Sequence, residues 1–188
     1  WEALSPSERQ QRVKAWSVRA LQVMGVQLQV QGVPPTQGPL LVLANHVSWL
    51  DIVVMNAACP GRFVSKSDVR HWPVIGRLVE GAGTLFIERE KRSDAMRVVH
   101  HMSERLRAGD VLAVFPEGTT GDGTELLPFH ANLLQAPLVT NVPVLPTALR
   151  YCDSPGGPRS SAPVFVGDTM FMPDYGTARA DFPEVTRG

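Results

Sequence analysis

Short apolar segments alternate along the chain with segments that carry apolar residues at helical spacing, and this alternation predicts the fold class. Short apolar segments predict four core strands, at 40–44, 62–65, 84–88 and 111–115. Segments with apolar residues at helical spacing separate these strands, at 48–58, around 72–80, and between a cap at Ser93 and a stop at Gly109. The uninterrupted run 40–44 is typical of a strand buried on both faces. We therefore expect an α/β fold with a largely parallel or mixed central sheet flanked by helices.

The N-terminal residues carry a different pattern. Residues 7–24 predict a basic amphipathic helix, which could lie on a membrane or pack on the domain. Val26–Gln31 alternates like an edge strand. We expect one globular domain, in which 1–31 form this helix and strand and 32–188 form the main unit.

The C-terminal part supports fewer predictions. A helix is expected at 127–136, and strands are expected at 142–150 and 164–166. After about residue 152 the chain is rich in Pro, Gly, Ser and Asp, and its structure stays open.

Charge and cysteine content narrow the function classes. The net charge of zero argues against general nucleic-acid binding. Residues 62–107 hold ten Lys/Arg against six Asp/Glu, which suits an anionic ligand, a membrane surface or simply solvated helix faces. The two cysteines match no disulfide framework or metal spacing, which favours a reduced, cytoplasmic setting.

The strand-to-helix turn at 45–51 carries the most informative chemistry. His46 precedes Asp51 by five residues, and Ser48-x-x-Asp51 matches a capping box with Ser48 at the N-cap. Because His46 precedes that helix, the carboxylate can reach the imidazole and hold it as a general base. The alternative is a histidine and an aspartate that merely cap the turn and the helix. No Gly-x-Ser-x-Gly elbow is present, so the base would activate a substrate hydroxyl or water.

Two more loops should leave the same edge of the sheet if its strands are parallel. The strand at 84–88 runs into Arg89, whose guanidinium suits a phosphate or carboxylate, although a surface ion pair would explain it too. The strand at 111–115 runs into three further candidates, Glu117, Gly118 and Thr119. The carboxylate could accept from substrate hydroxyls or hold Arg89. Gly118 and Thr119 could offer backbone N–H and hydroxyl donors to an anion. For Gly118, Gly121 and Gly123 the alternative is simple turn geometry.

Four segments in order resemble the sequence blocks of the glycerolipid acyltransferase family, typified by 1-acylglycerol-3-phosphate acyltransferase. They are 45–51, 83–89, 115–119 and 142–146. The first resembles the family's His-x4-Asp block, the second its block ending in a phosphate-binding Arg, the third its Glu-Gly-Thr block and the fourth an apolar strand with prolines. Order and spacing match over roughly residues 40–150, which is more specific than any single block.

The resemblance implies an O-acyltransferase of phospholipid biosynthesis. We expect no cofactor, and a metal site at His46 and Asp51 is disfavoured because no third or fourth ligand is evident nearby. The enzyme would move a fatty acyl group from acyl-CoA or acyl-carrier protein to the free hydroxyl of a lysophospholipid, most directly 1-acylglycerol-3-phosphate. His46 would deprotonate that hydroxyl and Asp51 would orient His46. The implied acceptor site consists of Arg89, Glu117, Gly118, Thr119 and, as a second phosphate ligand, Lys66.

One departure leaves the acceptor headgroup open. Many members follow Glu-Gly-Thr with Arg and Ser, whereas this chain has Thr120 and Gly121. Arg89 or Lys66 would then carry more of the phosphate binding, and another lysophospholipid or lyso-ornithine lipid stays possible. A hydrolase with the same base and a non-catalytic lipid- or acyl-carrier-binding module are further alternatives.

The resemblance also implies a location. Members usually attach to a membrane through N-terminal helices, so we expect the cytoplasmic face of the cell membrane. The chain begins at Trp1 rather than Met, and the expected attachment is peripheral or through a segment absent from this chain.

Overall fold

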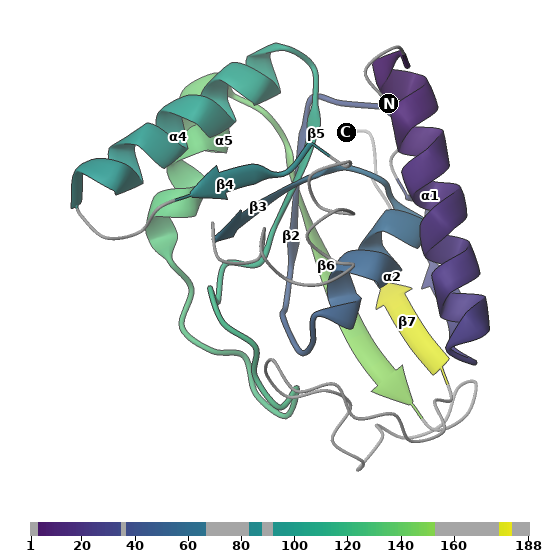
Figure 1. Ribbon diagram of the computed structural model, residues 1–188. Coiled ribbons are helices and arrows are strands. Elements are labelled where there is room, and N and C mark those ends of the chain that lie inside the picture. Colours follow the sequence, from purple (N-terminus) through teal and green to yellow (C-terminus); the bar gives the residue numbers. More distant parts are fainter. Residues whose placement is uncertain (1–3, 35–36, 67–82, 88–91, 153–176, 182–188) are drawn as a thin grey trace.

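The computed structural model describes residues 4–34, 37–66, 83–87, 92–152 and 177–181. Within these ranges a seven-stranded sheet has the order β1-β7-β6-β2-β5-β3-β4 (Figure 1). Its strands are β1 (Gln27–Gln31), β2 (Leu40–Ala44), β3 (Arg62–Lys66), β4 (Leu85–Ile87), β5 (Val111–Val114), β6 (Val144–Cys152) and β7 (Thr177–Asp181). The five strands from β6 to β4 are mutually parallel, and β7 pairs antiparallel with β6. The predicted α/β class with a largely parallel, mixed sheet is therefore confirmed.

Helices cover both faces of this sheet. They are α1 (Pro6–Val23), α2 (Leu50–Ala58), α4 (Arg92–Arg107) and α5 (Gln135–Thr140), with a 3-10 turn at Ala131–Leu134 before α5. Alternate residues of β5 serve opposite layers: Val111 and Ala113 pack with α1 and α2, whereas Leu112 and Val114 pack with α4 and α5. Figure 1 shows the two helix pairs on opposite faces of the sheet. This burial on both faces explains the uninterrupted apolar runs.

Helix α1 packs on the domain, as one of the two alternatives for residues 7–24 predicted. Val13, Ser17 and Leu21 recur at four-residue spacing and are buried on the side of α2. Trp16 stays 41% exposed, so it belongs to the outer face. No helix in the described ranges is long and apolar enough to cross a membrane.

Several predicted element positions were wrong. The segment 84–88 supplies the edge strand β4, not a core strand, because β3 separates it from β5. Ser93 lies inside α4 and is not its cap, since the helix already begins at Arg92. The stop at Gly109 is confirmed by its left-handed φ of 88°. The helix expected near 72–80 and the strand at 164–166 lie outside the described residues.

The segment 127–130 is not helical, contrary to the predicted helix at 127–136. Its backbone donors bind tertiary acceptors instead: Leu127 N–H reaches the Glu117 carboxylate at 2.9 Å, and His130 N–H reaches the Pro116 carbonyl at 2.8 Å. Helical backbone starts only with the 3-10 turn at Ala131. The edge position predicted for Val26–Gln31 is confirmed, although the neighbour of β1 is β7, a strand that sequence reasoning missed.

Candidate active site

The carboxyl end of β2 is held in place by a side chain that extends its pairing with β6. Asn45 Nδ2 donates to the Leu149 carbonyl at 3.0 Å, and the Leu149 N–H donates to Asn45 Oδ1 at 2.7 Å. The Asn45 side-chain amide thus makes the pair of hydrogen bonds that a further backbone residue of β2 would make with β6. These bonds lie beyond the last register pair, Ala44 and Thr147. The chain then leaves the sheet at His46 with a defined direction.

The side chains of His46 and Asp51 meet at this turn. His46 Nδ1 lies 2.8 Å from Asp51 Oδ2, which also accepts the backbone N–H groups of Val47 at 2.6 Å and Ser48 at 2.8 Å. Asp51 is fully buried, and its charge lies in the first turn of α2, where helix N–H groups favour an anion. The predicted contact is confirmed, and its catalytic role stays a prediction.

The predicted capping box is only half formed. Helix α2 begins at Leu50 with Trp49 as its N-cap, not Ser48. Asp51 does accept the Ser48 N–H, but the Ser48 hydroxyl accepts the N–H of Leu50 at 3.2 Å. The tight turn therefore points the Asp51 carboxylate back toward His46 while the hydroxyl satisfies a different donor of the helix N-terminus.

An aromatic ring supports the imidazole from one face. Phe115, directly after β5, stacks on His46 with ring centroids 4.1 Å apart and planes 9° apart, and Phe63 stacks on Phe115 at 5.7 Å. The His46 side chain is 17% exposed. Asp51 occupies Nδ1, and Nε2 makes no hydrogen bond within the described residues.

Glu117 joins the loop after β5 to the loop after β2. It is 5% exposed, and one carboxylate oxygen accepts the His46 N–H at 2.7 Å while the other accepts the Leu127 N–H at 2.9 Å. The Gly121 N–H returns to the His46 carbonyl at 2.8 Å. The predicted common edge is thus confirmed for these two loops. Both carboxylate oxygens of Glu117 already accept backbone N–H groups. A direct role of Glu117 toward substrate stays a prediction.

The remaining acceptor-site candidates differ in what the structure shows. The Gly118 N–H closes a turn onto the Phe115 carbonyl at 3.1 Å, so its predicted availability to an anion is not observed. Gly118 has a φ of 69°, which suits glycine, and Thr119 is exposed. The backbone of Lys66 ends β3 at the same sheet edge. Arg89 lies outside the described residues.

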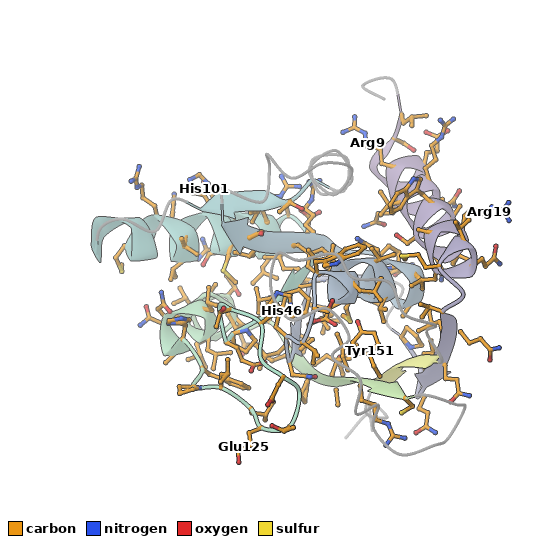
Figure 2. All side chains as sticks on the ribbon, turned by 60° about the horizontal axis from the view of Figure 1, so that its bottom comes forward. Arg9, Arg19, His46, His101, Glu125 and Tyr151 are labelled. Carbon is orange, nitrogen blue, oxygen red and sulfur yellow. The ribbon has the colours of Figure 1, made fainter. Side chains whose placement is uncertain are left out.

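Sequence reasoning missed three residues at this site: Asn45, Phe115 and Tyr151. The Tyr151 hydroxyl donates to Asp51 Oδ1 at 2.6 Å from the end of β6. Figure 2 labels His46 and Tyr151 and shows Glu125 on an outer loop that points away from them. The alternation along β6, which buries Leu145, Thr147, Leu149 and Tyr151, was the available signal that Tyr151 points inward.

A family model identifies the class of protein to which this parallel sheet and its histidine–aspartate pair belong. The family model described as Acyltransferase matches residues 26–150. The chain therefore belongs to the acyltransferase family that its four sequence blocks resemble.

Individual relatives agree with this membership. The chain is 40% identical to a lyso-ornithine lipid O-acyltransferase of Pseudomonas aeruginosa, over 89% of this chain and 64% of that protein. It is also 40% identical to a 1-acyl-sn-glycerol-3-phosphate acyltransferase of Neisseria gonorrhoeae, over 80% of this chain and 60% of that protein. The crystal structure of PlsC, the 1-acyl-sn-glycerophosphate acyltransferase of Thermotoga maritima, superposes with a TM-score of 0.71 at 26% identity and covers 93% of this chain and 67% of that one. The chain thus spans somewhat less than two thirds of the first two relatives.

Proposed function

We propose that this protein is an O-acyltransferase that transfers a fatty acyl group from a thioester donor to the free hydroxyl of a lysolipid. The observation that carries the proposal is the His46 imidazole, whose Nδ1 is held by the buried Asp51 and whose Nε2 is presented at the substrate edge of the sheet. Membership of the acyltransferase family supports the reaction class.

The reaction needs only one base. His46 Nε2 takes the proton of the acceptor hydroxyl as its oxygen attacks the thioester carbonyl, so a C–O bond forms. The C–S bond then breaks, and the imidazolium returns the proton to the leaving thiolate. Asp51 stabilises the imidazolium between these two steps. An ester and a free thiol are the products, and no covalent intermediate on the protein is required.

The acceptor is proposed to be a lysophospholipid, most directly 1-acylglycerol-3-phosphate, with phosphatidic acid as product. Lyso-ornithine lipid is the second candidate, because relatives with both names reach the same 40% identity. Thr120 and Gly121 place no cation after the Glu-Gly-Thr block, which leaves Arg89 and Lys66 as the proposed phosphate ligands. The donor is acyl-CoA or acyl-carrier protein.

A turnover assay tests this proposal. The full chain is incubated with a panel of 1-acylglycerol-3-phosphate, other lysophospholipids and lyso-ornithine lipid, each with acyl-CoA and with acyl-carrier protein, and the products are analysed by mass spectrometry. We expect an acylated acceptor whose formation requires both substrates. Release of free fatty acid without acceptor would instead identify a hydrolase. Saturable lipid binding without turnover would identify a non-catalytic module.

We also propose that the protein works at the cytoplasmic face of the cell membrane. On α1, Arg12, Trp16, Arg19 and Val23 recur at helical spacing beside the buried face, and all four are exposed. Figure 2 shows Arg19 pointing outward from this helix. A tryptophan between arginines suits the interface of an anionic bilayer.

Vesicle flotation tests the membrane proposal. We expect the protein to bind vesicles that contain phosphatidylglycerol more strongly than phosphatidylcholine vesicles, and the double variant Trp16→Ser/Arg19→Gln to lose most of that binding. Leu138→Ser is the matched control, because Leu138 is 78% exposed on α5, on the other face of the sheet. Equal losses in both variants would contradict a role for α1.

A further inference from the structure

We propose that Tyr151 is a positioning residue that sets the orientation and the proton affinity of the His46–Asp51 pair. Tyr151 lies one residue beyond the range that the family model matches. The kinetic part of this inference rests on the proposed acyl transfer, whereas nitrogen-15 NMR of the His46 imidazole tests it without turnover.

The geometry divides the partners of Asp51 between its two oxygens. His46 Nδ1 and the two backbone N–H groups all meet Oδ2, whereas the Tyr151 hydroxyl meets Oδ1 at 2.6 Å. Within the described residues, no other hydrogen bond is made to Oδ1. A carboxylate held at both oxygens cannot rotate about its Cβ–Cγ bond, so the plane that faces His46 is fixed from β6 as well as from the turn.

The hydroxyl is a permanent donor. Burial of Tyr151, together with the adjacent Asp51 charge and the hydrogen bond between them, raises the pKa of its phenol well above the ordinary value. The phenol therefore stays protonated wherever the enzyme works. A short hydrogen bond to a buried carboxylate draws charge from it, so Asp51 attracts the proton on His46 less strongly than an unbonded carboxylate would.

Few other charges in the described part of the chain face this pair. Glu117 contacts the His46 backbone and not its ring. Lys14 of α1 acts on Cys59, at the opposite end of α2 from Asp51. Arg150 alternates with Tyr151 along β6 and so points to the other face of that strand. The side chains of β7 lie outside the described part of the chain. Within the described residues, Tyr151 and His46 are thus the two titratable side chains that hydrogen-bond to the Asp51 carboxylate.

The test is Tyr151→Phe, which keeps the ring and removes the hydroxyl. We expect kcat to fall about tenfold, with the KM of donor and acceptor nearly unchanged, because a hydrogen bond to a charged group is lost and the carboxylate can rotate. The acid limb of the pH profile of kcat/KM should move to higher pH, because the carboxylate that has lost a hydrogen bond holds the His46 proton more tightly. A merely structural tyrosine would lower stability without moving this limb.

Thr147→Val is the matched control. Thr147 lies on the same buried face of β6, but its hydroxyl, unlike that of Tyr151, has no hydrogen-bond partner in the described residues. We expect this variant to keep the wild-type acid limb. A folded Tyr151→Phe protein with the wild-type kcat and the wild-type acid limb would overturn the proposal.

Two further measurements keep the inference testable if Tyr151→Phe does not fold or the wild type shows no turnover. Site-specific 3-fluorotyrosine at position 151 is nearly isosteric and a stronger donor, so it should move the acid limb to lower pH. Nitrogen-15 NMR of the His46 imidazole follows proton uptake without any substrate. We expect its titration midpoint to shift in the same directions, and unchanged midpoints in both forms would overturn the inference. Absence of wild-type turnover with shifted midpoints would contradict the proposed function alone.

Discussion

The Glu117 carboxylate accepts the backbone N–H of His46 at 2.7 Å, although 71 residues separate the two along the chain. Its second oxygen accepts the Leu127 N–H at 2.9 Å, so one buried side chain holds two loops together. The Glu-Gly-Thr segment therefore positions the proposed base, because Glu117 holds the backbone of His46. This effect is separate from any contact of the segment with the acceptor.

Glu117→Gln should lower the turnover rate and loosen the two loops that Glu117 holds, at His46 and at Leu127. A glutamine keeps one acceptor oxygen, and its NH₂ group would face either the His46 or the Leu127 N–H, leaving a donor unsatisfied at a cost of about 1–3 kcal/mol. Steady-state kinetics and hydrogen exchange at the His46 and Leu127 amides measure these two effects. Glu125→Gln is the control, since Glu125 is exposed in the same loop and should show neither change. Unchanged exchange at both amides would contradict the bracing role.

His46→Ala should abolish transfer while the protein stays folded. Removal of a general base costs about 10²–10⁴-fold in rate. The side chain is partly exposed and lies outside the sheet, so thermal unfolding should change only modestly. Mass spectrometry of the product and circular dichroism measure activity and fold. A folded, fully active His46→Ala protein would contradict the proposed mechanism.

Asp51→Asn should be severe but milder than His46→Ala. Two backbone N–H groups, of Val47 and Ser48, demand an acceptor at the Oδ2 position, so the amide oxygen should settle there and keep its contact with His46 Nδ1. The negative charge that stabilises the imidazolium is lost, and we expect kcat to fall about 10²-fold. The comparison of kcat for the two variants is the measurement. A larger loss in Asp51→Asn than in His46→Ala would contradict this order.

Arg89→Ala should raise the KM of the acceptor more than the KM of the acyl donor. Arg89 follows β4 in the sequence, and its guanidinium is the proposed ligand of the acceptor phosphate. Initial rates with each substrate varied in turn separate the two constants. Arg107→Ala, at the end of α4, is a control for the loss of one positive charge. Equal effects on both KM values would remove the phosphate-binding role.

Cys59 should stay protonated in the native protein at pH values where an unfolded thiol ionises. Burial raises the pKa of the Cys59 thiol from 9.0 to about 11. Because the unfolded chain releases this proton first, its contribution to stability is complete below pH 9 and is lost as pH rises toward 11, by about 1.4 kcal/mol per pH unit. Urea unfolding between pH 8.5 and 10.5 should show a shallower decline in Cys59→Ala. Tyr151 adds a decline of the same sign in both proteins, so identical slopes would contradict the prediction.

Local patterns predicted much of the fold because the faces that an element buries leave a periodic pattern along its own segment. The run 40–44 became β2 with the predicted bounds, and the helical spacing before Gly109 buried Val98, Val99, Met102 and Leu106. Predictions were wrong where tertiary contacts replaced local ones, as at 127–130, whose donors bind Glu117 and Pro116. The edge position of β4 depends on strand order, which no single segment encodes.

The candidate site divides in the same way. His46 and Asp51 lie within one turn, so the sequence by itself determined that they can meet, and parallel strands imply a shared edge with the loop at Glu117. Only the tertiary structure decided what holds them: Glu117 on the backbone of His46, Phe115 on its ring, and Tyr151, 100 residues from Asp51, on the second carboxylate oxygen. Such contacts join strands that are neighbours in space and distant in sequence. The alternation along β6 indicates only that Tyr151 points inward. Which residues then meet is decided when the sheet assembles, and that choice leaves no trace along the chain.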